Sequence, residues 1–188
     1  MGSNANAPHQ SSIAIGRDTV ANKDHALAMA TEARATGIQS VAIGSYSNAS
    51  VEHATAVGAA SKATGTASFA GGTSANAAGV SSVAVGGSMT AAEAAQAAQA
   101  VGNNSIAVGS KSSASQTADV AVGYNAKANG TSTGSDGDGV VNNAGSAMAI
   151  GTDSQATGIV ATAIGQRSQA LANGAVALGG DAQAKQGS

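Results

Sequence analysis

The feature that most constrains this chain is a short phrase, apolar–Ala–apolar–Gly, that recurs with a 14-residue period. The glycine of the phrase falls at Gly16, Gly44, Gly58, Gly72, Gly86, Gly109, Gly123, Gly151, Gly165 and Gly179, and Ala30 and Gly137 fill the two gaps. The one irregular interval, from Gly86 to Gly109, is one such period plus a nine-residue insert over 87–95. A fixed period of this length is typical of a solenoid in which each repeat forms one turn. The spacing predicts twelve turns and a partial thirteenth.

The alignment of the repeats predicts which side chains are inside. Alanine stands two residues before the glycine in eleven of twelve turns, and nine residues before it in eleven of twelve. Each turn offers two short extended segments with tight corners, where glycine is favoured. Because side chains alternate along a strand, these columns predict an interior made of Ala14, Ala42, Ala49, Ala56, Ala63, Ala84, Ala107, Ala114, Ala121, Ala149, Ala156 and Ala177.

The outward columns differ between the two strands of a turn. The first strand presents polar residues such as Asn48 and Lys62, whereas the second presents aliphatic ones. A soluble monomer does not expose a continuous apolar stripe, so we infer an obligate homo-oligomer with the stripes converging on a shared axis. The predicted subunit interface comprises Ile13, Ile15, Leu27, Met29, Val41, Ile43, Val57, Val83, Val85, Ile106, Val108, Val120, Val122, Met148, Ile150, Ile164, Val176 and Leu178.

Composition excludes several classes of protein. Leu, Ile, Val and Phe number 27 of 188 residues, too few for the core of an ordinary enzyme domain. Eight Lys and Arg against ten Asp and Glu, with few aromatic residues, argue against a basic nucleic-acid binder. The absence of cysteine excludes disulfides and cysteine-based metal sites. No apolar run is long enough for a transmembrane helix.

The repeats carry a family resemblance. The segment Asn104–Ser112 (NSIAVGSKS) resembles the YadA-like head repeat of trimeric autotransporter adhesins, whose consensus is NSVAIGxxS, and Gln39–Ser47 (QSVAIGSYS) is almost as close. Ser146–Ser154 (SAMAIGTDS) is a looser copy. The resemblance covers Ala7 to about Gln186. We therefore interpret 4–188 as one head domain with an insert at 87–95, and residues 1–3 as an expression remnant.

The resemblance implies an all-β fold, a left-handed parallel β-roll (β-solenoid) with 14-residue turns, assembled as a homotrimer. It implies display on the bacterial cell surface, with the full-length protein anchored in the outer membrane. It further implies a virulence-associated adhesin that binds host extracellular matrix proteins or cell-surface receptors, with no enzymatic activity and no cofactor. No membrane contact by this fragment is expected.

Three features are candidate sites. Asp136, in a run of alternating Gly and Asp, is a candidate axial ion site if it points to the trimer axis; the alternative is a solvent-exposed bulge. The insert 87–95 is expected to protrude, as a short helix or a loop. His25 and His53 share a column two turns apart, ~10 Å along the rod, which is too far for one metal ion, and His9 lies elsewhere in its turn. All three are expected to be solvated corner residues.

Other functions remain open at this stage. A rigid spacer module without a ligand of its own is the main alternative to an adhesin head. An acyltransferase of the hexapeptide type is disfavoured because the period of this chain does not fit a six-residue repeat. An ice-binding solenoid is disfavoured because threonine is irregularly placed. No set of serine, histidine and acid residues indicates catalysis.

Overall fold

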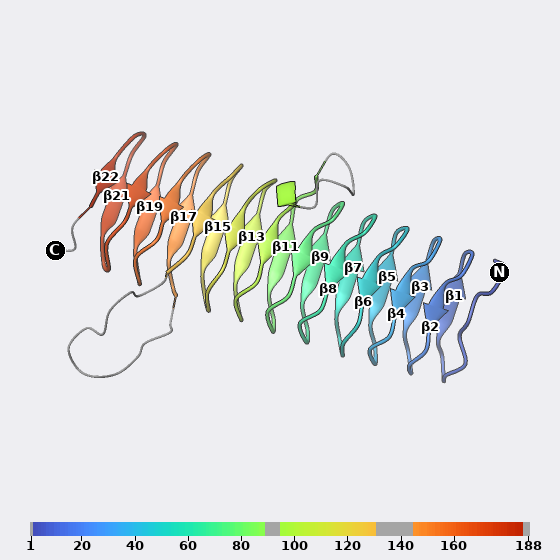
Figure 1. The fold of residues 1–188 in the computed structure, drawn as a ribbon. Coiled ribbons are helices and arrows are strands. Elements are labelled where there is room, and N and C mark those ends of the chain that lie inside the picture. The colour runs from blue at the N-terminus through green and yellow to red at the C-terminus, as the bar shows by residue number, and fades with distance from the viewer. Residues whose placement is uncertain (1, 89–94, 131–144, 186–188) are drawn as a thin grey trace, which may run out of the picture.

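The chain forms a two-sheet parallel β-solenoid, in which each turn adds one strand to each sheet (Figure 1). A computed structural model describes residues 2–88, 95–130 and 145–185. Over these residues each sheet has eleven strands, stacked in chain order, and the two termini lie at opposite ends of the rod. The all-β parallel solenoid predicted from the 14-residue period is therefore confirmed.

The odd-numbered sheet contains the three-residue strands that carry the repeated phrase. Its members are β1 (Ile13–Ile15), β3 (Leu27–Met29), β5 (Val41–Ile43), β7 (Thr55–Val57), β9 (Phe69–Gly71), β11 (Val83–Val85), β13 (Ile106–Val108), β15 (Val120–Val122), β17 (Met148–Ile150), β19 (Thr162–Ile164) and β21 (Val176–Leu178).

The even-numbered sheet contains two-residue strands. Its members are β2 (Val20–Ala21), β4 (Arg34–Ala35), β6 (Asn48–Ala49), β8 (Lys62–Ala63), β10 (Asn76–Ala77), β12 (Gln99–Ala100), β14 (Ser113–Ala114), β16 (Lys127–Ala128), β18 (Gln155–Ala156), β20 (Gln169–Ala170) and β22 (Gln183–Ala184). Before β2, Asn6 forms an isolated bridge with Val20, and the Asp18 amide donates to the carbonyl of Ser3 at 2.8 Å. Residues 3–6 thus extend the roll.

The register is set by the alanines. Every pair of neighbouring strands places alanine opposite alanine, as in Ala28 opposite Ala42. The ladder stays in register across the longer interval that contains the insert, where Asn76 pairs with Gln99 and Val83 with Ile106. The longer interval therefore falls between β11 and β12, and the register of both sheets is the same before and after it.

The predicted number of turns is wrong by one. The sequence pattern counts a turn ending at Gly137, but β15 pairs directly with β17, and β16 with β18. Among the described residues, Gly130 and Gly145 border residues 131–144, and no strand of the roll separates β15 from β17 or β16 from β18. The physical reason is visible in the columns: Val140 and Asn142 stand where the interior requires a very small side chain, and Asp136 stands in an apolar column.

The interior is lined by the smallest side chains. Every buried apolar residue in the described part of the chain is an alanine, and all twelve alanines predicted for the interior are 0–7% exposed. The buried polar side chains of the described residues are serines, Thr19 and Asp119. A core of methyl groups buries little apolar area per residue, so it contributes far less stability than a core of Leu and Ile.

Glycine is favoured at the two corners of a turn for different reasons. At the glycine corner, which joins an odd strand to the following even strand, Gly58 has a φ of +130° and an added Cβ would lie 2.7 Å from the carbonyl carbon of Gly72. At the opposite corner, Gly37 has no positive φ, and it is required because a Cβ would overlap the backbone of Val51. At both corners a non-glycine residue two places after the glycine is left-handed, such as Ala60 after Gly58 and Gln39 after Gly37.

Candidate functional surfaces

An apolar stripe runs along the outer face of the odd-numbered sheet. Each strand there presents two outward side chains around one buried alanine, so successive turns stack Leu27 on Val41 and Met29 on Ile43. Within a single chain these side chains are half-buried or exposed, and the exposed fractions of Ile13 and Leu178 reach 50% and 64% at the two ends. The apolar face assigned from the alternation is therefore open to solvent in one chain.

The sequence analysis left Phe69 out of this stripe. Phe69 pairs with Thr55 and Val83, its side chain is 38% exposed, and an added Cβ at Gly71 would meet its ring. Its position three residues before Gly72 is the signal that could have found it. Thr55 and Thr162 stand in the same column and are the polar interruptions of the stripe.

A polar column occupies the opposite, even-numbered sheet. One outward side chain per strand forms this column, which consists of Val20, Arg34, Asn48, Lys62, Asn76, Gln99, Ser113, Lys127, Gln155, Gln169 and Gln183. The amide of Asn76 donates to Gln99 Oε1 at 3.0 Å, so neighbouring members can contact each other. This face has the polarity that the outward pattern of the first strand predicted.

Charged residues gather at the corners, where they form ladders between turns. Arg167 donates two hydrogen bonds to Asp181, at 2.6 and 2.7 Å. The hydrogen bond from Arg167 lowers the pKa of the Asp181 carboxyl below its ordinary value. At the N-terminal end, Arg17 lies 3.3 Å from Asp18 and 3.8 Å from Glu32. Such exposed pairs each contribute little to stability.

The histidines lie where the sequence placed them. His25 and His53 occupy the left-handed position of the opposite corner, two turns apart, and both are exposed. His53 Nε2 lies 2.7 Å from Gln39 Oε1, and His9 Nδ1 lies 3.4 Å from Asp24. Within the described ranges, no three His, Asp or Glu side chains form a set that could hold a metal ion.

Asp119 is a buried carboxylate whose role the sequence analysis missed. It stands in a column otherwise filled by small residues, and its side chain is fully buried. Oδ2 accepts hydrogen bonds from the amides of Gln116 at 2.8 Å and Gly130 at 3.4 Å, and Oδ1 accepts one from Ala147 at 2.9 Å. Asp119 thus joins the two points where the chain leaves and rejoins the roll around 131–144. In the sequence, Asp119 is the exception among the small residues that stand four places before the repeat glycine, and this exception could have identified it.

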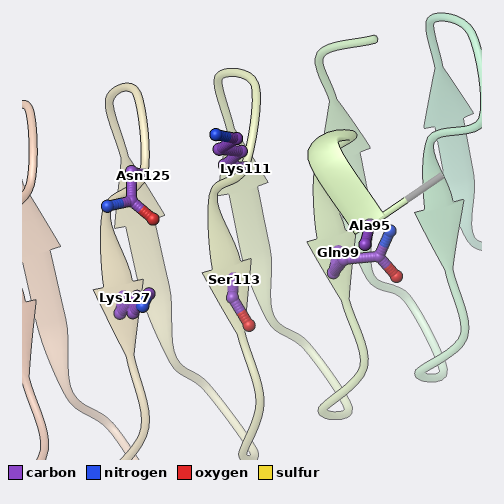
Figure 2. Close-up of a pocket in the computed structure, with 6 residues that line it drawn as sticks. All are labelled: Ala95, Gln99, Lys111, Ser113, Asn125 and Lys127. Atoms are coloured by element: carbon purple, nitrogen blue, oxygen red, sulfur yellow. The ribbon is translucent and has the colours of Figure 1, made fainter. Parts of the chain in front are cut away.

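The remaining candidates lie partly or wholly outside the described residues. Asp136 belongs to 131–144, and no turn stands between β15 and β17 to carry it into the stripe. Residues 89–94 of the insert are likewise outside. Two described parts of the insert contact the roll. The Gly87 carbonyl accepts a hydrogen bond from Ser110 Oγ at 2.7 Å. Ala95, in a short 3₁₀ turn, lies beside Gln99 of the even-numbered sheet (Figure 2).

Comparison with known families decides the identity of these repeats. The model of the YadA head domain repeat (2 copies) matches residues 1–19, 10–29, 35–61, 52–75, 96–112, 100–126, 114–133, 143–159 and 158–182, well over half of the chain. The chain belongs to the YadA head family. No curated protein matches it in a sequence comparison.

Membership in the YadA head family indicates the head of a trimeric autotransporter adhesin. This is a family of surface-exposed adhesin and structural modules rather than of enzymes. Two successive matches, 114–133 and 143–159, leave residues 134–142 unmatched between them. These unmatched residues fall between β16 and β17. No helix in the described part of this YadA head could cross a membrane.

Proposed function

We propose that this YadA head is the adhesive tip of a homotrimeric, left-handed β-roll displayed on the bacterial cell surface. The full-length protein would be anchored in the outer membrane, and the head would bind host extracellular matrix proteins or cell-surface receptors. The observation that carries the proposal is the division of the roll into one apolar and one polar outer face. The first face is suited to self-association and the second to contact with partners.

The apolar stripe supports the homotrimer. Exposed aliphatic side chains follow one another along the whole odd-numbered sheet, and the alanine interior offers little other burial. Covering the exposed half of one such side chain is worth about 1 kcal/mol, half of the value for full burial. Repeated over eleven strands, this is a large driving force for association, and a closed cyclic assembly covers every stripe.

A charge placed in the stripe tests the assembly. We expect Ile43→Asp, which puts a carboxylate between Met29 and Val57, to abolish trimer formation, because an unpaired buried carboxylate costs several kcal/mol. Asn48→Asp is the matched control, since it adds the same charge to the polar face of the same turn; Lys62→Ala is a second control. Light scattering should give three times 17.5 kDa for the wild type and both controls. A well-folded Ile43→Asp trimer would show that the stripe is not the interface.

A rigid spacer is the second candidate function. It is favoured by the unbroken register of both sheets and by surface grooves that are shallow and open. The two functions separate in a binding assay with the purified trimer on immobilised collagen, fibronectin and laminin. Saturable binding to any of them supports the adhesive head. Absence of binding to all three and to intact host cells supports the spacer.

A further inference from the structure

A groove of about 510 Å³ crosses three turns on the outer face of the even-numbered sheet. Gln99, Ser113 and Lys127 form its floor on β12, β14 and β16, Lys111 and Asn125 stand at the adjoining glycine corner, and Ala95 closes one end. Figure 2 shows Lys111 and Asn125 side by side on neighbouring corners, beyond Ser113 and Lys127. The foot of the insert therefore borders a groove lined by lysine, amide and hydroxyl side chains.

The described lining of the groove carries positive charge. Its described residues include two lysines and no acid. The ammonium of Lys111 lies 5.3 Å from the centre of the Tyr124 ring, a cation–π distance. The acid nearest in the ladder of corners, Asp153, accepts a hydrogen bond from Asn125 at 2.7 Å and so holds that amide at the rim. An anionic group would meet cationic, amide and hydroxyl side chains here.

Further cationic residues lie along the polar column, beyond the groove itself. Arg34, Lys62 and Lys127 belong to this column, and none of them forms an ion pair within the described residues. The acids of the described residues all lie at the corners or, for Asp119, inside the roll, so none interrupts the column. At ~4.8 Å per turn, Arg34 and Lys62 are ~10 Å apart and Lys62 and Lys127 are ~19 Å apart along one straight line.

We propose that the polar column, centred on the Lys111–Lys127 groove, binds a linear sulfated polysaccharide; this inference rests on the adhesive function proposed above and names its ligand class. Cations at intervals along a straight line match sulfate and carboxylate groups repeated along an extended glycan. The side-chain amides of Asn48 and Asn76 lie between these cations in the column and supply hydrogen-bonding groups for sugar hydroxyls. An acidic protein segment is the other candidate polyanion, and competition with poly-glutamate distinguishes the two.

The net charge of the chain makes the proposal testable with heparin. The chain has a formal net charge of −2, so retention by a polyanion requires a local cationic surface. The experiment measures binding of the trimer to immobilised heparin at several salt concentrations, with chemically desulfated heparin and poly-glutamate as competitors. We compare the wild type with Lys62→Gln/Lys127→Gln. The control double variant Arg17→Gln/Lys23→Gln removes the same charge from corners outside the column.

We expect the column variant to bind heparin about tenfold more weakly, at roughly two- to fivefold per exposed lysine, and the control to change less than twofold. Light scattering and circular dichroism should show both variants as folded trimers. Equal weakening by the two double variants would overturn the proposal, because net charge alone would then explain it. Competition by poly-glutamate or desulfated heparin as strong as that by heparin would also overturn it.

The two proposals fail in different ways. A trimer that binds immobilised matrix protein but not heparin refutes the glycan ligand and leaves the adhesive function in place. A trimer that binds neither matrix proteins, host cells nor heparin refutes both.

Discussion

Replacing Asp119 by alanine is the sharpest test of how the roll tolerates the segment between Gly130 and Gly145. The carboxylate accepts two short hydrogen bonds, from the amides of Gln116 at 2.8 Å and Ala147 at 2.9 Å, and a longer one from Gly130. Alanine leaves the buried Ala147 amide and the part-buried Gln116 amide without acceptors, at about 1–3 kcal/mol for the buried one and less for the other. Removing the buried carboxylate recovers part of its desolvation cost. We expect a net loss of about 2–4 kcal/mol of unfolding free energy.

Ser105→Ala is the matched control for Asp119→Ala. Ser105 stands in the same column one turn earlier, it is fully buried, and its hydroxyl makes no hydrogen bond in the part of the chain described. Its replacement should change the unfolding free energy by less than about 0.5 kcal/mol, because no partner is left unsatisfied.

Urea denaturation followed by far-UV circular dichroism measures both variants. Protein concentration must be held constant, because unfolding of an oligomer depends on it. Amide hydrogen exchange adds a local readout: in Asp119→Ala, exchange should accelerate at Gln116 and Ala147 and stay unchanged in β3–β9. Equal denaturation midpoints for Asp119→Ala and Ser105→Ala would refute the role assigned to the carboxylate.

Three further predictions concern the geometry of the turns. Deleting residues 131–144 joins Gly130 to Gly145 and restores a 14-residue interval between Gly123 and Gly151 (28 − 14 = 14), so the variant should keep the circular dichroism spectrum and trimer mass of the wild type; a disordered product would show that the segment is needed for folding. Ala30 occupies the glycine position with a φ of +101°, so Ala30→Gly should stabilise the roll by about 0.5–1 kcal/mol. Gly58→Ala should destabilise the roll by about 2 kcal/mol or more. Urea denaturation measures both changes. The lowered pKa of Asp181 means that its pair with Arg167 stabilises the fold above the ordinary carboxyl pKa of 3.8 and that this contribution is lost as the pH falls through the lowered value. Asp181→Asn should therefore lose less stability than the wild type as the pH falls below 3.8, and equal acid sensitivity would contradict the assignment.

The interior and the two outer faces could be predicted because the strand period is two. Once Ala42 is assigned to the interior, Val41 and Ile43 must point outward, and the same choice repeats in every turn. The columns also placed His25 and His53 at exposed corners. These are local consequences of alternation and of the 14-residue period, so the residues alone determined them.

The direct pairing of β15 with β17 and of β16 with β18 was decided only by the tertiary structure. The segment 131–144 has the same length as a turn, so spacing alone cannot distinguish a turn inside the roll from a segment outside it. The distinction depends on whether Val140 and Asn142 fit an interior built from alanine, and on the buried hydrogen bonds that Asp119 makes to both ends of the gap.

The groove at Lys111 and Lys127 also required the fold. These lysines belong to successive turns and occupy different columns, one at a corner and one on a strand. They face one groove because neighbouring turns stack in register and because Ala95, at the foot of the insert, returns to the same face. The sequence by itself determined the repeat, the alanine interior and the two faces, because these follow from local alternation. The number of turns, the buried carboxylate and the groove depend on contacts between segments distant in the chain, and these only the tertiary structure decided.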